Sequence, residues 1–167
     1  MQTTSKPLKD FLTNHLKSCL TPGTSAPGSG IKVAAKPLPG EIIILFQTDS
    51  SNGKRCLNVG SEKICDYLYF YNKNADKEIA CFLELKGTDL KSAAEQVEKT
   101  HEHLENLISK KVANDIPFLA RVCICLRSHA SSTSQKIRDK LIKIYGNKNI
   151  EIRHGITRHD IGPLLRR

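Results

Sequence analysis

Three charged residues in the middle of the chain stand in otherwise apolar segments. Asp66 belongs to the segment ICDYLYF, and Glu84 and Lys86 belong to the segment CFLELK. In a strand, alternation places Glu84 and Lys86 on one face. Charged groups in such apolar strands are costly to bury unless they are paired or bound to a metal ion. The two carboxylates and the ammonium therefore predict either a buried ion network or a Mg²⁺ site with the lysine beside it.

Two strands joined by a tight turn are expected to carry these charges. Residues 64–72 and 78–86 are rich in apolar and aromatic side chains, and turn-forming residues separate them. An apolar stripe at helical spacing then predicts a helix over 89–111, with an aspartate as its N-cap. Gln96 lies beside that stripe, about 100° around the helix from the next residue. This position allows it either to contact the charged residues or to border the core.

The remaining segments predict further helices and strands around this hairpin. Leucines and isoleucines at helical spacing mark residues 5–20 and 131–145 as helices. The other expected strands are 41–47, 54–60, 118–126 and 150–153. Residues 21–40 hold four of the seven prolines and four of the ten glycines, which predicts a long loop or flap. A hairpin-rich stretch followed by β-α-β predicts an α/β fold with a mixed central sheet flanked by helices.

The middle of the chain resembles the PD-(D/E)XK superfamily of restriction-endonuclease-like nucleases. Asp66, seventeen intervening residues and the triplet Glu84-Leu85-Lys86 match the D…(D/E)-x-K signature of that superfamily. Gln96 resembles the downstream glutamine of its RecB-like branch, which the resemblance adds to the catalytic residues. Two positions depart from the pattern. Cys65 replaces the proline that often precedes the aspartate, and Thr100 replaces the tyrosine of the RecB-like branch.

The resemblance implies a restriction-endonuclease-like α-β-β-β-α-β core, which fits residues 5–126, and metal-dependent hydrolysis of phosphodiester bonds without a covalent intermediate. It implies that Asp66, Glu84 and the Leu85 carbonyl hold Mg²⁺ or Mn²⁺, which lowers the pKa of a bound water and neutralises the phosphate. Lys86 would orient this water or stabilise the pentavalent phosphate. The implied substrate is nucleic acid, with DNA favoured over RNA.

The formal net charge of +9 is unevenly distributed along the chain. Residues 61–110 carry −3, whereas residues 131–167 carry +6. In the expected C-terminal helix, three lysines fall at i, i+4 and i+7 along one stripe, which suits contact with a phosphate backbone. The candidate nucleic-acid-binding residues are Lys136, Lys140, Lys143, Arg153 and Arg158. The same pattern also fits an ordinary solvated helix face followed by a basic tail.

The length of 167 residues predicts a single domain over 1–167 that buries a core without disulfides or structural metal. The longest apolar run, IIILF, is too short to span a membrane. Residues 1–20 lack the apolar core of a secretory signal, so a cytoplasmic protein is expected. The six cysteines form no C-x-x-C pair, which favours buried, reduced thiols over zinc ligands.

Two functions of other classes are compatible with the same sequence. The first is a nucleic-acid-binding module that has the fold but has lost catalysis, although the presence of Asp66, Glu84 and Lys86 argues against it. The second is an interaction subunit of a larger defence or repair assembly. For the nuclease as for these alternatives, a homodimer or a partner is expected, because the sequence contains no separate recognition domain.

Overall fold

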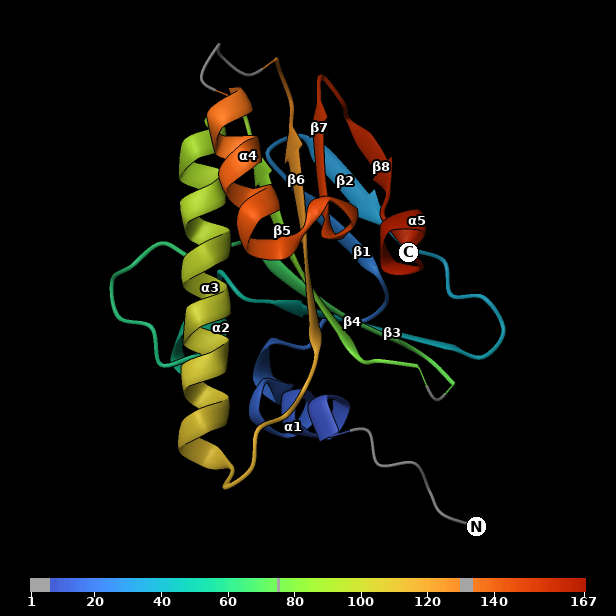
Figure 1. Cartoon of the computed structure of the whole chain (residues 1–167), viewed down its shortest axis with the longest axis vertical. Coiled ribbons are helices and arrows are strands. Elements are labelled where there is room, and N and C mark those ends of the chain that lie inside the picture. The colour runs from blue at the N-terminus through green and yellow to red at the C-terminus, as the bar shows by residue number, and fades with distance from the viewer. Residues whose placement is uncertain (1–6, 75, 130–133) are drawn as a thin grey trace.

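The computed structural model describes residues 7–74, 76–129 and 134–167. They form two mixed β-sheets flanked by helices, so the expected α/β class is confirmed. In Figure 1, helices α3 (Leu90–Lys111) and α4 (Ser134–Tyr145) cover one face of the larger sheet, and the smaller sheet lies over the other face. Within the described ranges, no helix has the length and apolar character needed to cross a membrane.

The larger sheet has five strands, whose order in space follows their order along the chain. They are β3 (Glu41–Gln47), β4 (Tyr67–Lys73), β5 (Ile79–Lys86), β6 (Leu119–Leu126) and β7 (Ile150–His154). Strands β3, β4 and β5 are antiparallel neighbours, whereas β5, β6 and β7 are parallel neighbours. Helices α3 and α4 provide the two crossovers that parallel pairing requires. The change from antiparallel to parallel pairing falls at β5, the strand that carries Glu84 and Lys86.

The smaller sheet joins segments that are far apart in the sequence. Its strands are β1 (Ser25–Gly28), β2 (Ile31–Ala34) and β8 (Arg158–Asp160). The segment 21–40, expected to be a loop, thus contains the antiparallel hairpin β1–β2, and β8 adds to β2 in parallel. Ser29 and Gly30 have φ values of 50° and 73°, as a two-residue type I′ turn requires. Pro27 lies on the edge strand, where its missing N–H costs no ladder hydrogen bond.

Three short α-helices and two 3₁₀-helices complete the described chain. The α-helices are α1 (Pro7–His15), α2 (Ser51–Cys56) and α5 (Gly162–Leu165), and the 3₁₀-helices are Lys17–Cys19 and Asn147–Asn149. The prediction of a strand over 54–60 is wrong, because Ser50 starts a helix there by accepting a hydrogen bond from the Gly53 N–H at 2.9 Å. A Cβ at Gly53 would lie 2.2 Å from the Thr48 carbonyl oxygen, so this helix requires glycine. Helix α1 ends at His15, short of the expected residue 20.

Several other expectations agree with the structure. The strand 41–47 coincides with β3, and the expected aspartate N-cap of α3 is Asp89, whose Oδ1 accepts from the Ser92 N–H at 2.9 Å.

Two elements of the structure, strand β8 and helix α5, were not expected from the sequence. Residues 131–133 of the expected helix 131–145 lie outside the described residues, and α4 begins at Ser134.

Alternation along the strands divides the core into two layers. Phe70 of β4 and Phe82 of β5 pack in the layer beneath α3, whereas Tyr69 and Leu83 pack in the layer beneath the smaller sheet. Glu84 is two residues after Phe82 in β5, so its side chain points to the same face and belongs to the helix layer. The buried cysteines of β6 point to the opposite face and belong to the layer beneath the smaller sheet. The two faces of one sheet therefore present different chemistry.

Candidate active site

Asp66 and Glu84 come together where β4 begins and β5 ends. The backbone N–H of Asp66 donates to Glu84 Oε2 at 3.0 Å, and the backbone N–H of Leu85 donates to Asp66 Oδ2 at 2.9 Å. Antiparallel pairing of β4 with β5 sets these two positions opposite each other. Asp66 lies just before β4 rather than within it, although the expected strand started at residue 64. Each carboxylate is thus held by the backbone that carries the other.

Lys86 ends β5 on the same face as Glu84. Its Nζ lies 3.1 Å from Glu84 Oε1. The Lys86 side chain is 27% exposed, whereas the Glu84 side chain is only 1% exposed. The pair therefore keeps its carboxylate covered and presents part of its ammonium to the solvent.

Gln96 of α3 joins this cluster from the helix layer. Its side chain is buried. In the amide orientation that gives both ends a partner, the nitrogen donates to Glu84 Oε1 at 3.1 Å and to the Ile64 carbonyl at 3.1 Å. The oxygen accepts from Lys86 Nζ at 3.0 Å and from the Ser92 hydroxyl at 2.8 Å. Of the two positions that the sequence allowed for Gln96, the structure places it at the charged residues.

The cluster contains more negative than positive charge. Burial and the neighbouring Asp66 carboxylate raise the pKa of Glu84 to about 8, despite the ion pair with Lys86. Burial also raises the pKa of Asp66, and the nearby Asp49 carboxylate adds to this rise. When both carboxylates are ionised, two negative charges face one ammonium among the described residues. In that state the site is short of one positive charge, whereas a proton on Glu84 balances it.

The donor atoms of this site suit a hard divalent cation. Mg²⁺ and Mn²⁺ prefer carboxylate and carbonyl oxygens, and Asp66 and Glu84 supply two carboxylates. The Leu85 carbonyl accepts a hydrogen bond from Ser29 Oγ at 3.0 Å, but a carbonyl oxygen has two lone pairs and can take a second partner. The missing positive charge is what a dication would provide. The residues present therefore fit the metal that the sequence resemblance implies.

Two threonines fix the backbone immediately before Asp66. The Cys65 N–H donates to Thr100 Oγ1 at 2.8 Å, and Thr100 Oγ1 donates to the Gln96 carbonyl at 2.6 Å. Thr48 Oγ1 donates to the Cys65 carbonyl at 2.5 Å. A proline at position 65 would lack the N–H that Thr100 accepts. Cys65 and Thr100, the two residues that depart from the superfamily pattern, are thus joined by one hydrogen bond. Their spacing in the sequence does not reveal this bond.

Further charged residues that the sequence did not single out surround the site. The backbone N–H of Arg127 donates to the Lys86 carbonyl at 3.0 Å, which places this exposed arginine at the same end of the sheet. Its guanidinium lies against the β1–β2 turn, where a Cβ on Gly30 would be 2.7 Å from Nη1. Asp49, whose charge raises the pKa of Asp66, forms an ion pair with Lys54 at 3.0 Å. These residues come from loops and from α2, which only the tertiary fold brings to β5.

The residues expected to bind nucleic acid divide between two surfaces. The α4 lysines, all exposed, are Lys136, Lys140 and Lys143. The first two line a groove of about 230 Å³ between α3 and α4, together with Lys91 at the start of α3. Arg153 of β7 contacts Glu151, and Arg158 belongs to β8 in the smaller sheet. The α4 lysines therefore share the helix face with the carboxylates, whereas the two arginines lie on the other side.

Comparison of the chain with family models, with curated proteins and with solved structures gave no match. The chemistry of the site is therefore inferred from its own geometry. That geometry consists of two backbone-held carboxylates, a partly exposed ammonium and a buried amide that contacts both charge types.

Proposed function

We propose that the chain is a metal-dependent nuclease that hydrolyses phosphodiester bonds, with DNA as the favoured substrate. The observation that carries this proposal is the reciprocal hydrogen bonding of Asp66 and Glu84 beside Lys86, which places two buried carboxylates next to one ammonium. An ion network built only for stability would gain more from matched charges, because the second carboxylate must either hold a proton or leave a buried charge uncompensated.

The fold supports the proposal through the order of its central elements. Helix α1, strands β3, β4 and β5, helix α3 and strand β6 follow the α-β-β-β-α-β order of restriction-endonuclease-like cores, with α2 inserted between β3 and β4. Strand pairs β3–β4 and β4–β5 are antiparallel, and the pair β5–β6 is parallel. We propose that this part of the chain is such a core, and that β1, β2, β7, β8 and the remaining helices are additions to it.

In this mechanism Asp66, Glu84 and the Leu85 carbonyl would hold Mg²⁺ or Mn²⁺. When bound, the metal supplies a water of lowered pKa and positive charge beside the phosphate. Lys86 has three N–H donors, of which Glu84 and Gln96 each engage one. The third donor is left for the attacking water or for a phosphate oxygen, whose charge grows in the transition state. Gln96 keeps the ammonium oriented because its oxygen accepts from Nζ.

The charge on the helix face supports a polyanionic substrate. Lys136, Lys140 and Lys91 line the groove at the start of α3, and Gln96 lies little more than one turn further along that helix. Arg127 adds a guanidinium at the same end of the sheet, on the side of the β1–β2 turn. A nucleic-acid backbone that crosses the helix face would meet the lysines beside the carboxylates.

The direct test measures cleavage of labelled duplex DNA, single-stranded DNA and RNA by the full chain with Mg²⁺ or Mn²⁺. Wild type should cleave at least one of them, and Asp66→Asn and Glu84→Gln should each lower the rate by about 10³-fold or more. Glu78→Gln is the matched control, because this buried carboxylate accepts the Leu8 and Lys9 N–H groups at the opposite end of β5. Cleavage that survives Glu84→Gln, or no cleavage of any substrate, would overturn the proposal.

A further inference from the structure

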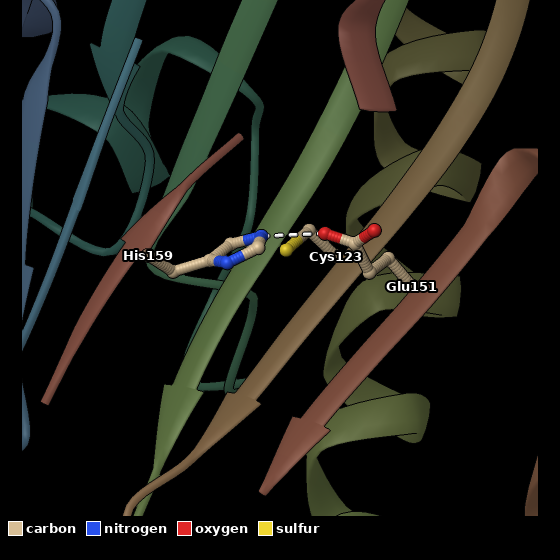
Figure 2. A group of neighbouring side chains, drawn as sticks. All are labelled: Cys123, Glu151 and His159. Atoms are coloured by element: carbon tan, nitrogen blue, oxygen red, sulfur yellow. Dashed lines mark hydrogen bonds and ion pairs between the residues drawn. The ribbon is translucent and has the colours of Figure 1, made fainter. Parts of the chain in front are cut away.

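Cys123, Glu151 and His159 meet on the face of the large sheet that is opposite the candidate active site. Each contributes one ligand atom, and these atoms all lie within 4.8 Å of one another. Figure 2 shows the three side chains converging from β6, β7 and β8. We propose that they form a second metal site, which takes a borderline-soft dication such as Zn²⁺.

The strand pairing builds two sides of this cluster. Cys123 and Glu151 are direct partners in the parallel pair β6–β7, so their side chains emerge next to each other on one face. His159 reaches them from β8 in the smaller sheet, and its Nε2 lies 2.5 Å from Glu151 Oε1. The ligands therefore come from three strands and from both sheets. No local sequence spacing links them.

The donor types select the class of metal. A thiolate, an imidazole and a carboxylate are the ligands that Zn²⁺ uses in proteins, whereas Mg²⁺ requires oxygen donors. Cys125 Sγ lies 3.8 Å from Cys123 Sγ. That is about the separation of two sulfurs that bind one tetrahedral Zn²⁺ with bonds of about 2.3 Å. The Cys125 thiol is thus a candidate for the fourth position, although it lies outside the group of atoms that are all within 4.8 Å of one another.

Glu151 is held as metal-binding carboxylates commonly are. Its Oε2 accepts from Arg167 Nη2 at 2.8 Å and from Arg153 Nη2 at 3.3 Å, while Oε1 faces His159. One oxygen is thus anchored and the other is presented to the cluster, an arrangement that supporting hydrogen bonds give to metal ligands. Metal binding also expels the Cys123 thiol proton, so a dication adds less than its full charge beside the two arginines.

One ligand of this cluster borders a cavity. Cys123 is fully buried and Glu151 nearly so, but the His159 side chain is 13% exposed. His159 also lines a cavity of about 420 Å³, together with Lys32 and Arg158. An ion bound here would join β8 to β6 and β7, and so hold the smaller sheet against the larger one.

The test begins with the full chain stripped of metal by a chelator and then titrated with Zn²⁺ or with Co²⁺ as a spectroscopic probe. Native mass spectrometry should show one Zn²⁺ per chain, and Co²⁺ should produce a thiolate-to-metal charge-transfer band. The melting temperature should rise by about 5–10 °C when Zn²⁺ is 100 times its dissociation constant. The absence of a thiolate band would show that the three residues are only a charge network and would overturn the proposal.

Variants assign the band to these residues. Cys123→Ser and His159→Gln should abolish it, and His159→Gln is the safer variant for folding because its side chain is partly exposed. Cys19→Ser is the matched control, since this buried thiol lies in the other core layer and donates to the Leu16 carbonyl. Glu84→Gln should also keep the band, so a failed nuclease assay and a failed metal site are separate results. A band that persists in His159→Gln would overturn the assignment.

Discussion

The two faces of the large sheet each hold a buried glutamate, and the two glutamates have opposite surroundings. Glu84 shares its site with a second carboxylate and one ammonium. Glu151 is surrounded by two guanidinium groups and one imidazole. Burial and Asp66 raise the pKa of Glu84 to about 8, whereas the hydrogen bond from His159 lowers the pKa of Glu151. Both side chains are under 10% exposed. Burial is the largest influence on the pKa of Glu84, whereas the groups around Glu151 outweigh the effect of its burial.

This contrast explains why the two faces suit different ions. On the helix face a positive charge is missing and every donor is oxygen, which favours a hard dication. On the other face the carboxylate is already balanced, and the additional donors are sulfur and nitrogen. A metal ion gains there by bonding to softer ligands rather than by neutralising charge.

The largest expected effect comes from exchanging the two glutamates for glutamine one at a time. Glu84→Gln should lower nuclease activity by about 10³-fold or more, because it removes a ligand of the proposed metal. Glu151→Gln should leave activity within about threefold but lower the free energy of unfolding by about 2 kcal/mol, since Arg153 and Arg167 lose their charged partner. Cleavage assays and urea titrations of both variants check this. Equal loss of activity in both would break the distinction between the faces.

The pH dependence of stability gives the next largest effect. Folded Glu84 keeps its proton up to a pKa of about 8, whereas in the unfolded chain it ionises near 4.5. The folded state therefore binds more protons between these values, so the free energy of unfolding falls as pH rises through this window. Without added metal the fall should be on the order of 2–4 kcal/mol between pH 5 and 8. Urea titrations at several pH values measure it.

Glu84→Gln is the control for this pH dependence and should flatten the curve. Mg²⁺ should stabilise the wild type more at pH 8 than at pH 6, because the cation replaces the proton that Glu84 holds. A wild-type curve as flat as that of the variant would mean that Glu84 ionises normally in the folded state.

The position of the carboxylates could be predicted because strand alternation is local. Alternation along β5 alone places the Glu84 and Lys86 side chains on one face of the sheet. A hairpin of β4 with β5 then brings Asp66 opposite Glu84. The cluster of Cys123, Glu151 and His159 could not be predicted in this way. It depends on the parallel pairing of β2 with β8, and no local pattern encodes a contact between segments so far apart in the chain.

Local signals were also misjudged where two of them competed. The density of proline and glycine over 21–40 predicted a loop, yet Ser29-Gly30 has the backbone of a tight hairpin turn and Pro27 sits on an edge strand. At 54–60 the strand prediction missed the capping serine at position 50. In both cases one to three residues with defined backbone roles outweighed composition.

The affinity for nucleic acid should also differ between variants of the two faces, by a smaller factor than the nuclease activity does. Replacing the α4 lysines with glutamine should weaken binding by about tenfold or more and reduce the salt slope by about 2–3. The matched variant replaces Lys32, Lys36 and Arg158, which line the cavity beside the smaller sheet, and should change affinity much less. Fluorescence anisotropy at several salt concentrations measures both. Equal weakening in the two variants would place the substrate on both faces.

The smallest effect is expected from removing the hydrogen bond that the Cys65 N–H donates to Thr100 Oγ1, just before Asp66. Thr100→Val keeps the side-chain shape but leaves the buried Cys65 N–H without its acceptor, so it should cost about 1–2 kcal/mol of stability. Nuclease activity should fall about three- to tenfold because Asp66 is the next residue along the chain, while a Co²⁺ thiolate band on the other face should not change.

Adding Cys65→Pro removes the donor as well, so the double variant should recover part of the lost stability. Removing both partners of a buried hydrogen bond costs less than removing one, and a double variant that is worse than the sum of the two single variants would show that position 65 needs its N–H for more than Thr100.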